Sequence, residues 1–177
     1  MVGNDIIDLS LARAESNWQR EGWIRKIFTK QEQAFLAASA KKELVVWLMW
    51  SMKEAAYKIY HRKYKEMFYA PQRFSCHDII IKDGRASGYV CFHQYIYHTS
   101  SYVSSTFIHT IALADNNFDD VSVFIQDKTK LASSYRQPDN LLKDEYGIPY
   151  YIDDSGIKKI ASRSHHGRFE AVVVAKT

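Results

Sequence analysis

The sequence has little cysteine and no long apolar run, and both absences limit what the protein can be. Its two cysteines, Cys76 and Cys91, lie in different segments without a paired spacing, which is typical of reduced thiols in a cytoplasmic protein. The longest apolar stretch, residues 44–50, is far shorter than the roughly 20 residues that a membrane-spanning helix needs. Residues 1–8 contain no basic region followed by an apolar run, so we expect no signal peptide. The sequence therefore predicts a cytoplasmic protein.

A large excess of charge is also missing. The chain has 24 basic and 20 acidic residues, and its net charge of +4 is well short of the excess typical of nucleic-acid-binding proteins. This mild excess suits an anionic cofactor or an acidic protein partner. The chain has 177 residues, of which 46% are hydrophobic, so it can build a folded core. We expect a single domain over residues 1–177; if two small units share the core, they are 1–127 and 128–177.

Three segments in the first part of the chain have the pattern of helices. Segments 11–21 and 29–40 look helical, and Thr29 followed by Glu32 is the pattern of a capping box. Apolar residues recur at steps of three and four over residues 44–63, so the sequence predicts its longest helix there.

The remaining segments predict strands. Residues 2–9 are short and β-branched, which indicates a buried strand ending in Asp8. Further strand-like runs continue to the end of the chain, and two of them flank Asp83-Gly84 as in a hairpin. These runs are residues 77–82, 88–95, 106–114, 121–126, 149–152, 157–161 and 169–175. The polar residues 128–146 predict a connector with a short helix at 140–145. The predicted fold class is therefore α+β: a strand, three helices and then mostly antiparallel strands.

The longest predicted helix carries a charged pair, Glu54 and Lys58, which are four residues apart and therefore share a face. An exposed pair at this spacing is common and stabilises a helix by about 0.2–0.5 kcal/mol, so the spacing alone favours a solvated ion pair. Trp47, Trp50 and Tyr57 crowd the same helix, however, and we expect the pair to be partly desolvated. Desolvated charges need partners such as a metal or a phosphate.

Two further carboxylates, Asp5 and Asp8, lie in the predicted N-terminal strand. Because side chains alternate along a strand, these two can face one site only if the chain bends after Asp5. The alternative for Asp8, which we weigh about evenly, is to cap the helix that follows. Asp5 lies among apolar residues, where an acid is costly unless it binds a partner. Carboxylates that can hold a divalent cation, together with Lys58, are what a phosphate-handling site needs, and this combination indicates an enzyme.

These two segments resemble the two signatures of the 4′-phosphopantetheinyl transferases. Residues 3–9 match the Gly-x-Asp-Ile-x-Asp/Glu-Leu strand, and residues 50–58 match the Trp-Ser/Thr-x-Lys-Glu-Ala-x-x-Lys helix. Between them, residues 25–32 look like the Arg-x-Phe-Thr-x-x-Glu element that usually separates the two. Three elements in order over residues 2–63 make the match specific, and the resemblance implies the fold of this family.

The resemblance implies a Mg²⁺-dependent enzyme that transfers 4′-phosphopantetheine from coenzyme A to a serine of an apo acyl or peptidyl carrier protein, releasing adenosine 3′,5′-bisphosphate. Asp5 and Glu54 are the expected metal ligands, with Asp8 as a third ligand or in the shell behind them. Asp5, Glu54 and Lys58 are the expected catalytic residues. Lys58 would bind the pyrophosphate, and Glu54 would take the proton of the attacking serine, directly or through a water. Lys53, about 100° round the helix, is expected to contact the 3′-phosphate of coenzyme A or the acidic partner.

The C-terminal part extends the resemblance. Residues 146–150 resemble the family's Gly-Lys-Pro turn, and residues 162–167 resemble a Ser-x-Ser-His loop that precedes an apolar strand. In the family this loop helps to bind the 3′-phosphate end of coenzyme A, so the resemblance assigns that role to Ser164 and His165. Ile148 stands where the turn has its lysine, which removes one expected phosphate contact. Without the resemblance, the pair of neighbouring histidines would indicate a surface turn or, less often, metal ligands.

Residues 64–140 match no family motif closely, and two interpretations remain open. The chain is either a short unit with an insertion or a rearranged protein of two units, with residues 107–112 as a second copy of the loop-and-strand element. Sites in this family lie at the junction of two units. A single unit would therefore have to form a homo-oligomer, whereas an internal second unit permits a monomer.

Carrier proteins are acidic helical bundles, so the resemblance also predicts a basic patch on this chain. The candidates are Arg13, Arg20, Arg25 and Lys26, each of which is singly more often an ordinary solvated charge. The pathway, whether fatty acid, polyketide or peptide biosynthesis, is left open. An alternative function is a non-catalytic module that binds coenzyme A or a carrier protein with the same fold. Nucleic-acid binding would show a steep salt dependence, and the small net charge argues against it.

Overall fold

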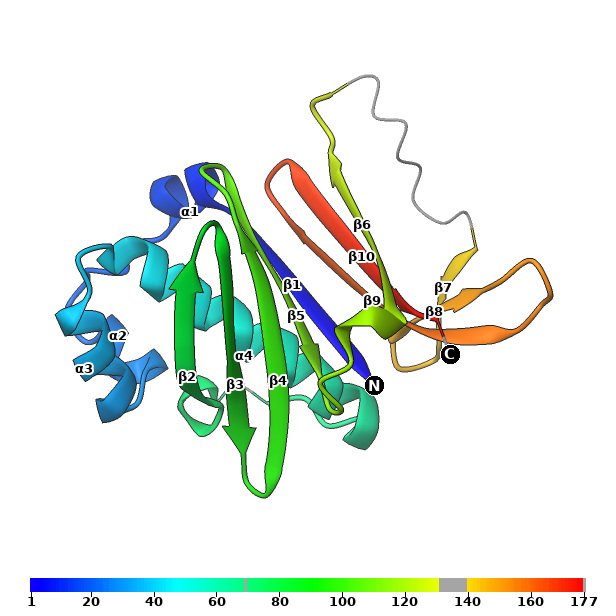
Figure 1. Ribbon diagram of the computed structural model, residues 1–177, viewed down its shortest axis with the longest axis horizontal. Helices are drawn as coiled ribbons and strands as arrows, with labels where there is room; N and C mark the ends of the chain where they lie inside the picture. Colours follow the sequence, from blue (N-terminus) through cyan, green and yellow to red (C-terminus); the bar gives the residue numbers. More distant parts are fainter. Residues whose placement is uncertain (69, 131–139, 177) are drawn as a thin grey trace.

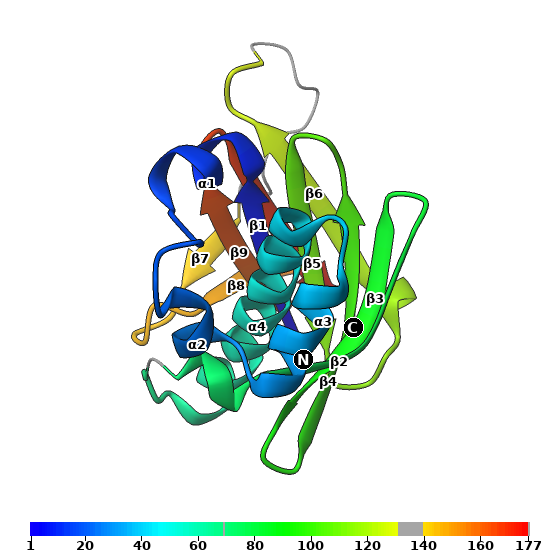
Figure 2. The same cartoon turned by 90° about the vertical axis from the view of Figure 1, so that its left-hand side faces the viewer.

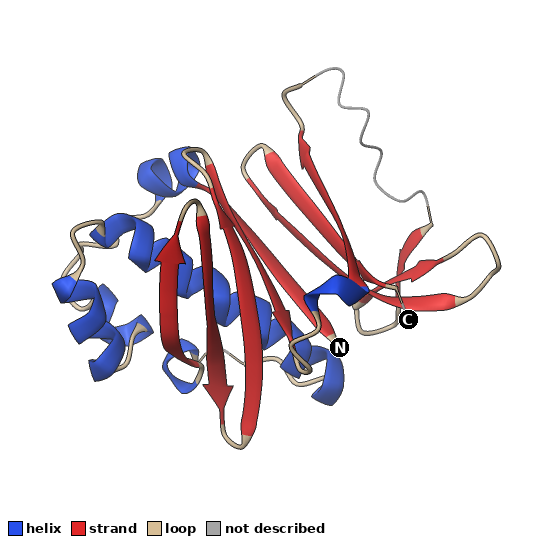
Figure 3. Cartoon of the chain, viewed as in Figure 1, coloured by secondary structure: helices blue, strands red, loops and turns tan. Residues whose placement is uncertain are grey.

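The structure, a computed structural model, describes residues 1–68, 70–130 and 140–176. Its strands form two antiparallel five-stranded sheets, which lie beside each other in Figure 1. The α-helices lie together beside the first sheet (Figure 3). In chain order they are α1 (Leu9–Glu15), α2 (Trp23–Ile27), α3 (Lys30–Ala38) and α4 (Lys42–Tyr64). The predicted α+β class with antiparallel strands is confirmed.

The first sheet joins the N-terminal strand to the middle of the chain, in the order β1-β5-β4-β3-β2. Its strands are β1 (Val2–Asp8), β2 (Ser75–Lys82), β3 (Arg85–Phe92), β4 (Tyr95–Val103) and β5 (Phe107–Leu113). Asp83 and Gly84 connect β2 to β3 with φ angles of 48° and 72°. Two successive positive φ angles are what a two-residue type I′ turn requires, so the predicted hairpin is confirmed.

Strand β4 is not predicted from the sequence. The predicted strand 88–95 runs across a turn at His93-Gln94, after which β4 begins at Tyr95. His93 has a φ of 52° in this turn, a left-handed conformation for which glycine or asparagine is the usual signal. Because that signal is missing, the sequence shows one strand where the structure has two.

The second sheet has the order β6-β10-β9-β8-β7. Its strands are β6 (Val121–Asp127), β7 (Leu141–Lys143), β8 (Pro149–Ile152), β9 (Lys158–His166) and β10 (Phe169–Ala175). The predicted strands at 149–152 and 169–175 are confirmed. Because β6 pairs with β10 over its whole length, a boundary between residues 127 and 128 would separate β6 from its own sheet. Short 3₁₀ helices, Pro71–Arg73 and Phe118–Asp120, precede β2 and β6.

Two predictions in this half are wrong. Residues 141–143 of the predicted short helix at 140–145 form strand β7, because they pair with β8. Residues 162–166 belong to strand β9 rather than to a loop, since they pair with β10 as far as the turn at Gly167. The rest of the predicted connector includes residues 131–139, which lie outside the described residues.

The helices largely follow the predicted pattern. The capping box is confirmed, since the side chain of Thr29 accepts a hydrogen bond from the backbone of Glu32 and the carboxylate of Glu32 accepts one from the backbone of Thr29. The long helix expected over 44–63 is α4. The single helix expected over 11–21 is wrong, because α1 ends at Glu15 and α2 begins after Gly22. Within the described ranges, no helix is long and apolar enough to span a membrane.

Strand β1 lies between α4 and the second sheet (Figures 1 and 2). Its side chains alternate between these neighbours. Ile7 joins the main core with α4, whereas Val2 packs with Val173 and Ile6 packs with Phe169, both in β10. Both halves of the molecule therefore meet on this short strand.

Candidate active site

The close packing of β1 on α4 brings the two motif segments together. Gly3 makes this packing possible, because a Cβ atom at this position would lie only 2.0 Å from the backbone oxygen of Ala55. Two residues further along, the alternation of the strand turns Asp5 toward the same helix. There Asp5 meets Glu54 and Lys58, which are one turn apart on α4.

Lys58 forms an ion pair with β1. Its Nζ lies 3.5 Å from Oδ1 of Asp5 and donates a hydrogen bond of 2.7 Å to the backbone oxygen of Asn4. The side chains of Asp5 and Lys58 are 15% and 30% exposed. The predicted partial desolvation of Lys58 is therefore confirmed, and its ammonium is held in place before any ligand binds.

Burial raises the pKa values of the two carboxyl groups, Asp5 and Glu54. Burial, and then the neighbouring charge of Asp5, raise the pKa of Glu54 to about 7, although the Lys58 ammonium opposes the shift. Burial also raises the pKa of Asp5 against the opposing effect of Lys58. A divalent cation would relieve the repulsion between two such carboxylates. Mg²⁺ is usually bound by one or two carboxylates, with waters and substrate phosphates as its other ligands, so Asp5 and Glu54 fit this ion.

Asp8 does not join the carboxylate pair. Strand β1 keeps its register with β5 as far as Asp8, so Asp5 and Asp8 project from opposite faces. The Oδ1 atom of Asp8 accepts hydrogen bonds from the backbone of Ser10 (3.0 Å) and Leu11 (3.4 Å), and Oδ2 lies 3.7 Å from Nε of Arg168. Throughout the described part of the chain, no three His, Cys, Asp or Glu side chains gather as a metal site. The predicted third ligand is thus corrected, and the alternative of a helix cap is confirmed.

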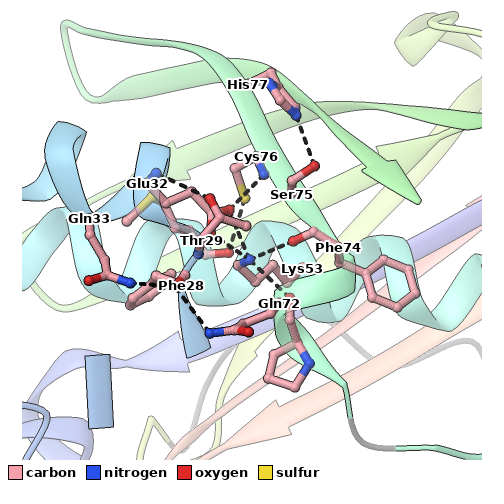
Figure 4. Close-up of polar contacts among 12 residues, drawn as sticks. Phe28, Thr29, Glu32, Gln33, Lys53, Gln72, Phe74, Ser75, Cys76 and His77 are labelled. Atoms are coloured by element: carbon pink, nitrogen blue, oxygen red, sulfur yellow. Dashed lines mark hydrogen bonds and ion pairs between the residues drawn. The ribbon is translucent and has the colours of Figure 1, made fainter. Parts of the chain in front are cut away.

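Lys53 lies in a buried network rather than at a ligand site (Figure 4). Its ammonium forms an ion pair of 2.8 Å with Glu32 and donates to the backbone oxygens of Pro71 (3.0 Å) and Phe74. The side chain is 2% exposed. An ammonium has three N–H donors, and these three partners use all of them. The prediction that Lys53 contacts coenzyme A or the partner protein is therefore wrong.

Glu32 is the common acceptor of this network. Besides the ammonium of Lys53, its carboxylate accepts hydrogen bonds of 2.7 Å from the backbone N–H groups of Thr29 and Cys76. These contacts tie α3 and the start of β2 to α4 (Figure 4). The segment at 25–32 thus fixes the helix at the residue next to Glu54, and this gives the separating motif a structural role.

The second sheet covers the free edge of β1. The backbone N–H of Asn4 donates to Oγ of Ser162, and that of Asp8 donates to Nδ1 of His166, both at 2.9 Å. Because β1 is the edge strand of the first sheet, these groups would otherwise be unpaired. Both acceptors lie on β9. Strand β9 is therefore held against the strand that carries Asp5.

Asn4 and Ser162 were not predicted as site residues. Asn4 is fully buried, and its Oδ1 accepts a hydrogen bond of 2.8 Å from Oγ of Ser162. Its Nδ2 donates to the backbone oxygen of Ala171 and lies near Nε2 of His109, both at 3.2 Å. An asparagine inside an apolar strand is a signal that partners exist, because buried amides are hydrogen-bonded. The sequence does not tell which partners they are.

Two hollows meet at His165 of β9. The larger has a volume of about 420 Å³, and its charged lining residues are Lys58, Arg62, Lys128, Lys143, Arg163 and, when protonated, His165. The second, of about 320 Å³, is lined by residues that include Asp5, His165, His166, Trp23, Trp47 and Trp50. The larger hollow suits an anion because all its lining charges are positive. We call it the cationic hollow.

The structure places the two predicted residues of β9, Ser164 and His165, in different environments. His165 lines both hollows and so spans the distance from Asp5 to the cationic hollow. Ser164 is buried, and its hydroxyl has no hydrogen-bond partner among the described residues. Ile148, in the turn before β8, lines the cationic hollow. Glu54 lines neither of these hollows but borders a third, of about 190 Å³, whose lining includes the rings of Tyr57, Phe68 and Phe74.

Comparisons with known proteins agree with this arrangement. Residues 1–114, more than half of the chain, match the 4′-phosphopantetheinyl transferase superfamily. The chain is also similar to the fatty acid synthase alpha subunit hexA of Dothistroma septosporum, with 38% identity over 64 residues. That stretch covers 36% of this chain and 19% of the relative. The family match includes both motif segments and the residues Asp5, Glu54 and Lys58, and the chain belongs to the 4′-phosphopantetheinyl transferase superfamily.

Proposed function

We propose that this chain uses Mg²⁺ and coenzyme A to attach 4′-phosphopantetheine to a serine of an apo carrier protein, with release of adenosine 3′,5′-bisphosphate. Membership of the superfamily supports a transferase of this kind. The observation that carries the proposal is the convergence of Asp5, Glu54 and Lys58, the last of which lines the cationic hollow. Two carboxylates and a lysine next to an anion-binding hollow are the groups that a phosphoryl transfer requires.

In the proposed reaction, the serine oxygen attacks the phosphorus that carries the pantetheine arm. A new P–O bond forms while the bond from this phosphorus to the bridging pyrophosphate oxygen breaks, and adenosine 3′,5′-bisphosphate leaves with the electron pair. Glu54 accepts the proton of the serine. The pKa of about 7 that burial and Asp5 give Glu54 applies to the site without metal. This pKa would be lower with Mg²⁺ bound, so the carboxylate would be ionised and able to accept the proton directly or through a water.

Lys58 would stabilise the negative charge of the leaving group. Its ammonium is already oriented by the backbone oxygen of Asn4 and by Asp5, so little reorganisation is needed when the pyrophosphate binds. Asp5 and Glu54 would hold Mg²⁺, which when bound neutralises charge on the pyrophosphate oxygens.

The cationic hollow is the proposed place for the phosphates of coenzyme A. The assignment of Ser164 and His165 to the 3′-phosphate end stays a proposal. The position of His165 between the two hollows supports its part, since the ring can face a ligand that extends from Asp5 into the cationic hollow. Ser164 is buried and lines neither hollow, so its proposed part is to support the strand that carries His165.

Both walls of the site come from one chain, so we propose that the protein acts as a monomer; in solution this 177-residue chain should have a mass near 20.6 kDa. The partner would be an acidic carrier protein, in keeping with the net charge of +4. Similarity to a fatty acid synthase subunit makes an acyl carrier domain of fatty acid synthesis the first candidate. Carriers of polyketide and peptide synthesis complete the panel to be tested.

The transfer is tested with coenzyme A, Mg²⁺ and this panel of apo carriers, with the mass of each carrier as the measurement. We expect one carrier to gain the arm, and Glu54→Gln to slow the gain about 100-fold or more because the proton acceptor is lost. Circular dichroism should show an intact fold. Glu66→Gln makes the same chemical change at an exposed position just beyond α4, and we expect it to leave the transfer unchanged.

Two results would speak against the proposal. Full transfer by the Glu54→Gln protein would contradict the assignment of the base. Binding of coenzyme A that is independent of Mg²⁺, without transfer to any carrier, would instead favour the non-catalytic binding module.

A further inference from the structure

Arg62 connects the two walls of the cationic hollow. It lies on α4 one turn beyond Lys58 and lines this hollow. Its Nη2 atom donates hydrogen bonds to the backbone oxygens of Pro149 (2.8 Å) and Ala161. These acceptors belong to β8 and β9, so the guanidinium reaches from the helix of the first half to the sheet of the second.

The charge of Arg62 is poorly compensated. Both of its hydrogen bonds go to neutral carbonyl oxygens, and its buried Nε has no hydrogen-bond partner among the described residues. The acid that acts on it electrostatically, Asp144, forms its own ion pair with Lys65 at 3.3 Å. A half-buried cation without a counter-ion is unfavourable unless an anion approaches it.

Other cations of the hollow do have carboxylate partners. Lys128 and Arg163 both pair with Glu170, and Lys58 pairs with Asp5. Lys143 is exposed to solvent, where an unpaired ammonium is stable. Arg62 is therefore the half-buried member of the set that has most to gain from an anionic ligand.

The turn that Arg62 contacts is the one in which a lysine is missing. Ile148 immediately precedes Pro149, lines the same hollow and is buried. Its side chain is apolar and cannot bind a phosphate. The guanidinium of Arg62 reaches this turn from the opposite wall, so a positive charge is present in the hollow although the turn carries none.

We propose that Arg62 binds the 3′-phosphate of coenzyme A and supplies the charge that the turn lacks. The inference rests on the proposed function. A guanidinium is suited to phosphate because it offers several donors in one plane. Lys58 lies against Asp5 at the reacting pyrophosphate, and Arg62 is one turn, about 5.4 Å, further along the helix. The two cations therefore serve different phosphates of one ligand.

The test compares the affinities of the protein for coenzyme A and for 3′-dephospho-coenzyme A by isothermal titration calorimetry. We expect the unmodified protein to prefer coenzyme A, and Arg62→Met to lower the affinity for coenzyme A about tenfold with little change for the dephospho compound. Lys63→Met removes the neighbouring cation, which is exposed and lies over the ring of Tyr95 outside the hollow. The Lys63→Met protein should still prefer coenzyme A to 3′-dephospho-coenzyme A.

Arg62→Met also removes the hydrogen bonds to Pro149 and Ala161. A second variant is therefore needed to distinguish the loss of the positive charge from the loss of these structural contacts. Adding Ile148→Lys to Arg62→Met restores a cation in the turn but not those bonds, and we expect it to recover the preference for coenzyme A. An equal loss for both ligands that Ile148→Lys does not repair would overturn the inference. So would an unchanged preference in Arg62→Met while the unmodified protein binds coenzyme A. Failure of the unmodified protein to bind coenzyme A would overturn the proposed function as well.

Discussion

Two lysines of one motif, Lys53 and Lys58, have opposite environments although they are only five positions apart. The ammonium of Lys58 lies at the partly open site against Asp5, whereas that of Lys53 is buried against Glu32. On a helix, five residues correspond to more than one turn, so the two side chains project in different directions. Lys53 supports the helix, and Lys58 faces the proposed ligand site.

Replacement of these lysines should therefore have different effects. Lys53→Met should lower the free energy of unfolding by about 3–5 kcal/mol, because it leaves Glu32 buried without a counter-charge. The double variant with Glu32→Gln should recover part of this loss. Lys58→Met should abolish transfer with a much smaller effect on stability, since this side chain is 30% exposed. Urea unfolding measures the difference, and equal losses of stability in the two single variants would contradict it.

At the scale of elements, the site depends on how closely β1 approaches α4. Gly3→Ala should separate the two, because the new Cβ would lie 2.0 Å from the backbone oxygen of Ala55, which cannot rotate away as a side chain could. Gly3 does not have a positive φ, so the contact alone accounts for the effect. We expect a loss of stability of about 1–3 kcal/mol and a lower rate of transfer, as Asp5 moves away from Glu54. Thermal unfolding measures the stability, and the carrier-mass assay measures the rate of transfer. If both were unchanged, the contact between β1 and α4 could accommodate a Cβ atom at position 3, and the prediction would be wrong.

The same elements show what could be predicted from the sequence. The alternation of β1 and the turn of α4 are local regularities, so they predict the faces on which Asp5, Glu54 and Lys58 lie. The resemblance of the two segments to the transferase signatures, and not the periodicity, implied that these faces meet. The burial of Lys53 does not, because its partners Glu32, Pro71 and Phe74 come from other elements. Local patterns describe which face a side chain has, and only tertiary packing decides what covers that face.

The docking of β9 on β1 was beyond sequence reasoning for a related reason. Its contacts use side chains as acceptors for the edge of β1, with Ser162 and His166 in place of a backbone ladder. The segment was interpreted as a loop because it resembles the family's Ser-x-Ser-His loop. Pairing with the apolar strand β10 makes it a strand instead.

At the scale of the whole molecule, His109 links stability to pH. This ring is 3% exposed, and burial, followed by the charge of Lys58, lowers its pKa to about 3. In the unfolded chain a histidine takes up a proton near pH 6.5. Between these values the unfolded state binds more protons, so acidification should destabilise the fold by about 1.4 kcal/mol per pH unit, and this contribution ends above pH 6.5.

A comparison of the protein with His109→Gln isolates this effect. Urea unfolding from about pH 4 to about pH 8 should show that the variant lacks the additional slope below pH 6.5. The raised pKa values of Asp5 and Glu54 act in the opposite direction, but both proteins share them, so they cancel in the difference. An equally steep loss of stability in the variant would contradict the assignment to His109.

The junction between β1 and β9 also implies an order of assembly. Asn4 and Ser162 are 158 residues apart in the chain, and contacts over such separations form slowly because the intervening loop must first be closed. The first sheet and α4 use residues 2–113, so Asp5, Glu54 and Lys58 can gather while the second sheet is still being synthesised. A chain emerging from the ribosome would thus hold its proposed catalytic groups before it has a wall for coenzyme A, and it would become able to bind its substrate only after β9 has docked.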